Sequence, residues 1–264
     1  MAHTIDFGGN FQTFGKWSVT GTAGNVVTIT GTSTSNLIAG PAVTGVDYLA
    51  MGTWGFSTTS PGEFYVGANS TGTAAAPVFR TAAPAPRTLY WVGGTGNWSS
   101  TTKWSTSSGG GSGAAIPTSL DAVNFDSASN ATAYTATIDA GVTLARCASF
   151  TMAGPASGNV TFAGSVGIAF HGNVSFAATG ITRTYTGGMQ WAGNSSYTFT
   201  TNGVALNSLC TVIGIGSTWA LGGAINTTSF SFVHGGFLPH LHQITQLHRA
   251  GFLQAVTPTS ESLV

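Results

Sequence analysis

Pairs of large apolar residues separated by one position recur along the second half of the chain. They are Val160 and Phe162, Ile168 and Phe170, Val174 and Phe176, Met189 and Trp191, and Tyr197 and Phe199. A period of two is that of a β-strand with one buried face. Most pairs are followed closely by a small residue and glycine, or by Asn-Gly, which indicate turns. The pattern therefore predicts a run of short strands joined by tight turns.

Strands this short cannot bury an apolar face alone, so they must stack against one another. A right-handed parallel β-helix with a coil of about 20 to 25 residues is the simplest arrangement that does this. An antiparallel sandwich is the alternative. The irregular spacing of the strands does not decide between the two.

A tryptophan-rich segment, residues 90–126, precedes these strands. It places Trp91, Trp98 and Trp104 within fourteen residues and continues through a Ser/Gly-rich loop to an alternating strand at 120–125. Large rings bury much apolar surface. We predict that the segment caps a β-solenoid that runs to Val233, so that residues 88–233 form one domain.

The N-terminal part, residues 1–82, also consists of short apolar runs spaced by Gly, Ser, Thr and Pro. This pattern is typical of a β-sandwich or small barrel, and we predict a β-sandwich-like domain. A proline-containing run at 81–86 favours a linker at residues 83–87. The predicted fold is therefore all-β, with a sandwich-like domain followed by a solenoid.

The last segment, residues 234–264, differs in composition from the strands before it. Leu, Pro, His, Gln and Arg dominate, and all of these can be encoded by codons that begin with C. Our hypothesis is that this tail is the β-repeat read out of frame. As written, it is either disordered or a helix that begins at Pro239.

Charge is scarce in this chain. Only 5% of residues are charged, and seven basic and seven acidic side chains give zero net charge. Proteins that bind nucleic acid need a basic face, so we expect neither a nucleic-acid partner nor membrane insertion. The N-terminus lacks the basic and apolar regions of a signal peptide. Release inside a virus particle would explain an extracellular protein without one, and we expect a virion or extracellular location.

Acidic residues are too sparse to predict a catalytic site. Polysaccharide-cleaving enzymes need clustered carboxylates, but none lies between Asp139 and Glu261. We therefore expect Asp121, Asp126 and Asp139 to serve turns and caps, and we predict a protein that is not an enzyme.

Metal and cofactor sites are not predicted either. His234, His240, His242 and His248 have spacings that could reach one zinc ion, but no cysteine or carboxylate accompanies them locally. His171 stands next to a turn glycine and is expected at the surface. The glycines of residues 93–96 lack the lysine and helix of a phosphate loop, so we expect a tight turn.

Two cysteines and three tryptophans complete the candidates. Cys147 and Cys210 lack metal-site spacing and are expected to be buried thiols, with a disulfide as the alternative. Trp54, Trp91 and Trp98 are candidates for stacking on a glycan. The alternative is that their rings belong to the core or cap.

Two motifs in this chain resemble those of a known class of proteins. The pattern W-x-G-G-x-G-x-W-S-x-x-x-x-W begins at Trp91, and P-x-x-x-D-x-V-x-F begins at Pro117. Together with the region up to Val233, they resemble repetitive, β-rich proteins of environmental tailed phages and marine bacteria. The resemblance implies a surface-exposed structural or adhesive protein with a β-solenoid body, and it implies no catalytic residues.

These observations lead to one expected function and two alternatives. We expect a non-enzymatic structural protein of a phage virion, a fibre or a capsid-decorating appendage that could mediate surface adhesion. Its expected partners are further copies of itself, other virion proteins and a cell-surface glycan. The first alternative is a bacterial extracellular adhesin or filament subunit. The weaker alternative is a glycan-binding or glycan-degrading β-helix protein.

Overall fold

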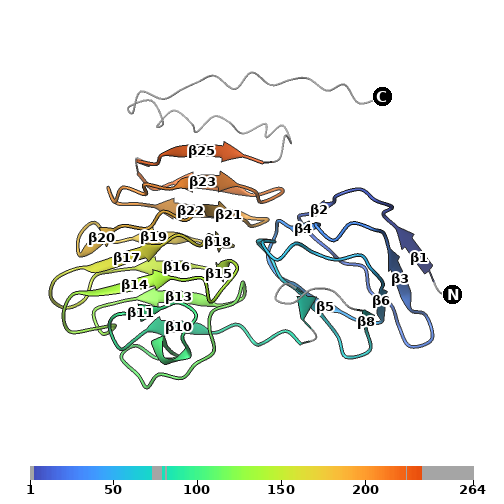
Figure 1. The fold of residues 1–264 in the computed structure, drawn as a ribbon, viewed down its shortest axis with the longest axis horizontal. Helices are drawn as coiled ribbons and strands as arrows, with labels where there is room; N and C mark the ends of the chain where they lie inside the picture. The colour runs from blue at the N-terminus through green and yellow to red at the C-terminus, as the bar shows by residue number, and fades with distance from the viewer. Residues whose placement is uncertain (1–2, 73–78, 81, 224, 234–264) are drawn as a thin grey trace.

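The chain forms two stacks of short β-strands that lie side by side (Figure 1). A computed structural model describes residues 3–72, 79–80, 82–223 and 225–233. Within them, helical structure is limited to one 3-10 turn, η1 (Thr101–Lys103). Residues 82–87 form no strand and connect the stacks. The fold is therefore all-β, as predicted.

The larger stack is a β-solenoid built from three sheets. The first sheet has the order β12-β10-β13-β16-β19-β22-β24, with bounds β10 Thr88–Trp91, β12 Trp104–Ser105, β13 Ala122–Phe125, β16 Phe150–Met152, β19 Val174–Phe176, β22 Ser196–Thr200 and β24 Thr218–Leu221. The second contains β11 Gly96–Asn97, β14 Tyr134–Ile138, β17 Val160–Gly164 and β20 Ile181–Arg183. The third contains β15 Ala145–Cys147, β18 Ile168–Phe170, β21 Met189–Trp191, β23 Leu209–Val212 and β25 Ser229–Phe232.

Strand register confirms the parallel solenoid and its coil length. In the third sheet Ile168 pairs with Met189, Met189 with Cys210, and Cys210 with Phe230, which gives coils of 21, 21 and 20 residues. Most of the paired apolar residues are buried as their period predicts, and Val160 and Phe162 are both fully buried; Tyr197 is only half-buried. Strand β12 alone runs antiparallel, against β10.

The tryptophan-rich segment closes the first end of this solenoid. The rings of Trp91 and Trp98 both meet Trp104 edge-on, with centroids 5.2 Å and 4.8 Å away. The indole nitrogens also find partners, since Trp91 Nε1 donates to the Gly94 carbonyl and Trp104 Nε1 to the Trp98 carbonyl, both at 2.8 Å. The three rings thus pack together in the first coil, where the sequence predicts a cap.

The N-terminal stack is a second, shorter solenoid. Its strands are β1 His3–Asp6, β3 Val27–Thr30, β6 Leu49–Met51 and β8 Thr71–Gly72 in one sheet, β2 Thr13–Phe14 and β4 Leu37–Ile38 in another, and β5 Val43–Val46, β7 Phe64–Val66 and β9 Phe79–Arg80 in a third. All the pairs between these named strands are parallel. The domain thus differs from the predicted β-sandwich. Apolar periodicity marks strands but does not encode the direction in which they pair.

Candidate functional site

The three tryptophans predicted to stack on a glycan lie in the two hydrophobic cores. Trp54 and Trp91 are 0% exposed and Trp98 is 1% exposed. Trp54 stacks on Phe7 in the N-terminal core, and the other two form the cap. A sugar needs an accessible ring face, so the structure supports the alternative, in which these rings belong to the core and cap.

The three aspartates expected at turns and caps do occupy such positions. Asp139 accepts hydrogen bonds from the Ser99 amide and hydroxyl, at 3.0 Å and 2.7 Å, and Asp126 accepts one from the Ala128 amide at 3.0 Å. Asp121 pairs with Arg87, with Nη2 and Oδ2 2.6 Å apart. Burial by itself would raise the pKa of Asp121, but the hydrogen bonds from Arg87 and Thr118 outweigh it and hold the pKa below its usual range.

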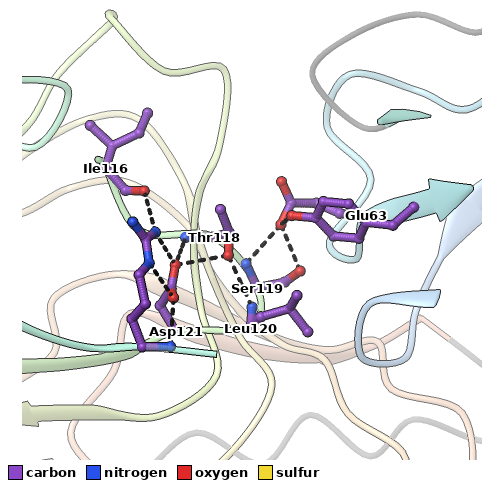
Figure 2. A network of polar contacts seen from close by, with 8 residues as sticks. Glu63, Ile116, Thr118, Ser119, Leu120 and Asp121 are labelled. Atoms are coloured by element: carbon purple, nitrogen blue, oxygen red, sulfur yellow. Dashed lines mark hydrogen bonds and ion pairs between the residues drawn. The ribbon is translucent and has the colours of Figure 1, made fainter. Parts of the chain in front are cut away.

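The strongest concentration of buried polar groups lies at the junction between the two solenoids. Glu63, which directly precedes β7, is 1% exposed. Its Oε2 atom accepts hydrogen bonds from the amide and hydroxyl of Ser119, at 2.8 Å and 2.7 Å, and from the Tyr65 hydroxyl at 3.1 Å (Figure 2). Charge-assisted hydrogen bonds of this kind are stronger than neutral ones. Glu63 therefore ties the N-terminal solenoid to the turn at 118–121.

The same turn is held from its other side by the end of the linker. Arg87 donates to Asp121 through its backbone amide at 3.0 Å and through Nε at 2.9 Å. Thr118 adds two hydrogen bonds to the same carboxylate, each of 2.8 Å. Figure 2 shows that the two networks meet at adjacent residues, Thr118 and Ser119. The linker end and the N-terminal solenoid thus fasten to one turn.

Arg146 makes the most extensive contacts across the junction. It lies on β15 of the larger solenoid and is 4% exposed. Its guanidinium donates to the carbonyls of Thr58, Ser60 and Pro61 in the N-terminal solenoid, with the shortest bond, to Ser60, at 2.7 Å. The fixed fork of donors suits such a set of acceptors. Arg146 therefore fixes the 58–61 loop against the larger solenoid.

His171 lies one coil further along and contacts the same loop. The structure corrects the prediction of a surface turn residue, because His171 is 4% exposed and its Nε2 lies 2.9 Å from the Pro61 carbonyl oxygen. Since a carbonyl only accepts, we assign the proton to Nε2. The pKa of His171 is lowered to about 4, mainly because burial disfavours the charged ring; the Pro61 contact opposes this shift and the positive charge of Arg146 adds to it. The ring is neutral near pH 7.

A small apolar contact completes the junction. Ala39 from the N-terminal solenoid clusters with Ala192 and Ile213 of the larger one. Beside it, Gly15 lies against Ile215 so closely that any larger residue would clash: a Cβ atom added at position 15 would be 2.6 Å from the Cβ of Ile215. Only glycine permits this approach of the two backbones. The junction thus combines buried polar anchors with a close-packed apolar edge.

The candidate metal-binding and phosphate-binding residues can be compared with their places in the described part of the chain. No group of three or more His, Cys, Asp or Glu side chains in this part of the chain is arranged to hold a metal ion. The histidines considered as zinc ligands, at 234, 240, 242 and 248, lie outside the described residues, as does the predicted tail helix. Gly93 and Gly94 both have positive φ, of 72° and 69°, consistent with the predicted tight turn.

The two cysteines are buried and free, as expected, and form no disulfide. Desolvation raises the pKa of the Cys147 thiol well above its usual value. The nucleophilic form of a cysteine is the thiolate, and burial disfavours it here. These thiols therefore behave as core residues and not as a reactive pair.

One hollow opens on the N-terminal solenoid where its first sheet ends. It has a volume of about 420 Å³ and is lined by Asp6, Gly8, Gly9, Thr30, Gly31, Thr32, Gly52 and Thr53. Its only carboxylate, Asp6, accepts a hydrogen bond from the Gly8 amide at 2.8 Å. One carboxylate committed to a turn does not supply an acid and a base for glycoside cleavage.

Sequence reasoning missed the junction, although a signal was present. In a chain with so few charges, Arg146 is the only cation between Lys103 and Arg183, and Glu63 the only acid between Asp47 and Asp121. Isolated charges within apolar strands are rarely buried unless they are paired or hydrogen-bonded. Their isolation indicates contacts distant in sequence, but it does not identify the partners.

Comparisons with known proteins give no relative for this chain. No family model, no curated protein and no solved structure matches it. Within the described residues, no helix is sufficiently long and apolar to span a membrane.

Proposed function

We propose that this protein is a non-enzymatic structural protein of a phage virion, where it forms a fibre or a capsid-decorating appendage. The observation that carries the proposal is that the acidic side chains hold the fold together instead of facing a common ligand. Each acidic residue in the described part of the chain accepts hydrogen bonds within the fold. They are Asp6, Asp47, Glu63, Asp121, Asp126 and Asp139.

This use of carboxylates favours a scaffold over a hydrolase or lyase. A glycan-cleaving site needs two carboxyl groups that face the same ligand with different pKa values. Glu63 and Asp121 are instead sealed in the junction, and the others hold turns. Lowered pKa values at Asp121 and Asp139 keep these groups ionised as acceptors and make them poor general acids.

The junction between the two solenoids supports a structural role. Domains that move relative to one another usually meet through modest, exposed interfaces. Here Glu63, Arg146 and His171 are all nearly inaccessible, and they bond across the two solenoids. A fixed angle between two stiff solenoids suits a protein that projects from a particle.

The outer surface is suited to contacts with neutral partners. On the sheet of β14, β17 and β20, Thr135, Thr161 and Thr182 follow one another in register and face outward. Hydroxyl groups can both donate and accept hydrogen bonds. Such a face favours contact with other virion proteins or with a cell-surface glycan over contact with a charged polymer.

Two assays test this proposal. The purified full-length chain is incubated with a panel of neutral and acidic polysaccharides, and new reducing or unsaturated ends are measured; we expect none above a heat-denatured control. Antibodies against the chain are then applied to purified phage particles and to bacterial cell-surface fractions, both taken from a sample in which the chain is detected. Labelling of particles supports the proposal, whereas polysaccharide cleavage or labelling confined to cells contradicts it.

A further inference from the structure

The far end of the larger solenoid exposes residues that belong to its interior. One inward-facing column runs through the third sheet in register, from β15 to β25. The exposed fractions along it are 0% for Cys147, 0% for Phe170, 1% for Trp191, 9% for Val212 and 53% for Phe232. Phe232 thus occupies a core position that no further coil covers within the described residues.

The neighbouring residues extend this apolar surface. We define the end face as Trp219, Leu221, Ile225, Phe230, Phe232 and Val233. Val233 is 51% exposed. No charged residue occurs anywhere between Arg183 and Arg249. Exposed apolar surface without charge, at the end of a stack of strands, is typical of an interaction site.

Unpaired strand edges accompany the apolar residues. Among the described residues, β24 pairs only with β22, and β25 pairs only with β23. Each terminal strand therefore leaves a row of backbone donors and acceptors without a strand partner. Such edges readily pair with another chain.

We propose that this end face binds the end face of a second copy of the chain, forming a two-fold, end-to-end dimer. A two-fold axis perpendicular to both the solenoid axis and β25 brings Phe232 of each copy against the apolar residues of the other. The terminal strands of the two copies then run antiparallel, so that the donors of one edge meet the acceptors of the other. The face carries no charge, so two copies meet without repulsion.

The asymmetry of the solenoid limits the assembly to two copies. At its first end the apolar core is sealed by Trp91, Trp98 and Trp104, which are at most 1% exposed. Joining two open ends leaves only sealed ends outside, whereas a fibre needs two binding ends on every copy. The inference deepens the proposed structural role and rests on it, because a projecting appendage gains length from such a dimer.

The sequence beyond Val233 lacks the apolar pattern of the preceding coils. Residues 234–264 contain no pair of large apolar residues at i and i+2, the pattern that marks the predicted strands of the solenoid. Their apolar residues, such as Leu238, Leu241, Ile244 and Leu247, recur at every third position. The end face of a second copy matches this one, because it offers the same apolar residues and the same two terminal strand edges.

The test compares native masses of full-length variants by light scattering and sedimentation. We expect wild type to have twice the monomer mass of 26.7 kDa. Phe232→Lys should raise the dissociation constant by about tenfold or more, because each dimer would bury two like charges in an apolar face. Phe11→Lys is the matched control, since Phe11 is 54% exposed on the other solenoid, and it should leave the dimer intact.

Circular dichroism checks that both variants stay folded. A monomeric wild type would overturn the dimer and leave residues 234–264 as the remaining cover for the end face. An oligomer that survives Phe232→Lys, or one that grows into fibres, would also overturn it. None of these results bears on polysaccharide cleavage or particle labelling, so failure of the dimer is distinguishable from failure of the proposed function.

Discussion

His171 and Pro61 are 110 positions apart in the chain, yet the imidazole Nε2 of one lies 2.9 Å from the carbonyl oxygen of the other. The contact joins the two solenoids and places a neutral histidine beside Arg146 in a buried site. Protonation of the imidazole would place a second positive charge beside Arg146, in a site where water cannot solvate it. The junction should therefore be sensitive to acid.

We predict that the free energy of unfolding falls as the pH is lowered from 6.5 to about 4. The pKa of His171 drops from its ordinary value of 6.5 to about 4 on folding, so the unfolded chain binds the proton first. The stabilisation is complete above pH 6.5, and about 3 kcal/mol is lost by pH 4. Denaturant unfolding across this range measures it.

His171→Gln is the control for this pH dependence. A glutamine amide can donate to Pro61 but does not titrate. The loss between pH 6.5 and 4 should therefore become much smaller. An unchanged slope in this variant would assign the acid sensitivity to other groups. Asp121 and Asp139 do not account for it, because their lowered pKa values place their contribution below pH 3.8.

Arg146→Ala should loosen the junction. It removes the donors to Thr58, Ser60 and Pro61 and leaves the buried Ser60 carbonyl without its two bonds from this guanidinium, at a cost of roughly 2–4 kcal/mol. We expect faster proteolysis in the linker at 82–87. Lys16→Ala removes an exposed cation from the same protein and should change neither stability nor cleavage. Equal behaviour of the two variants would contradict the anchoring role.

Asp121→Ala should be among the most damaging single changes of charge. The carboxylate is fully buried, whereas its partner Arg87 is 25% exposed. Partial hydration of the stranded arginine reduces the penalty, so we expect a loss of roughly 2–3 kcal/mol. Asp6→Ala, which removes an exposed turn carboxylate, should cost less than 1 kcal/mol. Thermal unfolding of both variants measures the difference.

Trp98→Ala distinguishes a capping tryptophan from a sugar-binding one. Removal of this buried ring should destabilise the larger solenoid by roughly 3–5 kcal/mol. Wild-type protein and this variant, both kept below the variant's melting temperature, should bind a glycan array equally. A stable variant that loses glycan binding would restore the stacking role.

The two cysteines offer a test of core integrity. Cys147 and Cys210 are buried and free, and the chain has no other cysteine. We expect no reaction with a thiol reagent in the native protein and two equivalents in denaturant. Rapid labelling of one thiol without denaturant would show that the solenoid core opens locally.

Sequence alone determined the local structure of this protein. Apolar pairs such as Val160 and Phe162 predicted short half-buried strands, and the tryptophan cluster around Trp98 predicted a cap while leaving glycan stacking open; the fold buries these rings. The absence of acids between Asp139 and Glu261 ruled out a paired carboxylate site along most of the larger solenoid. These features are readable because period, ring size and charge act within a few residues.

Only the tertiary structure decided how these pieces meet. The same apolar runs at Val27 and Leu49 suit a sandwich or a solenoid, and their parallel pairing appears only in the fold. His171 follows a strand as a surface turn residue would, but the neighbouring solenoid buries it. Pairing direction and the partners of an inter-domain contact depend on residues far apart in the chain, and local periodicity does not encode them; an isolated charge such as Arg146 indicates a distant contact but does not identify its partner.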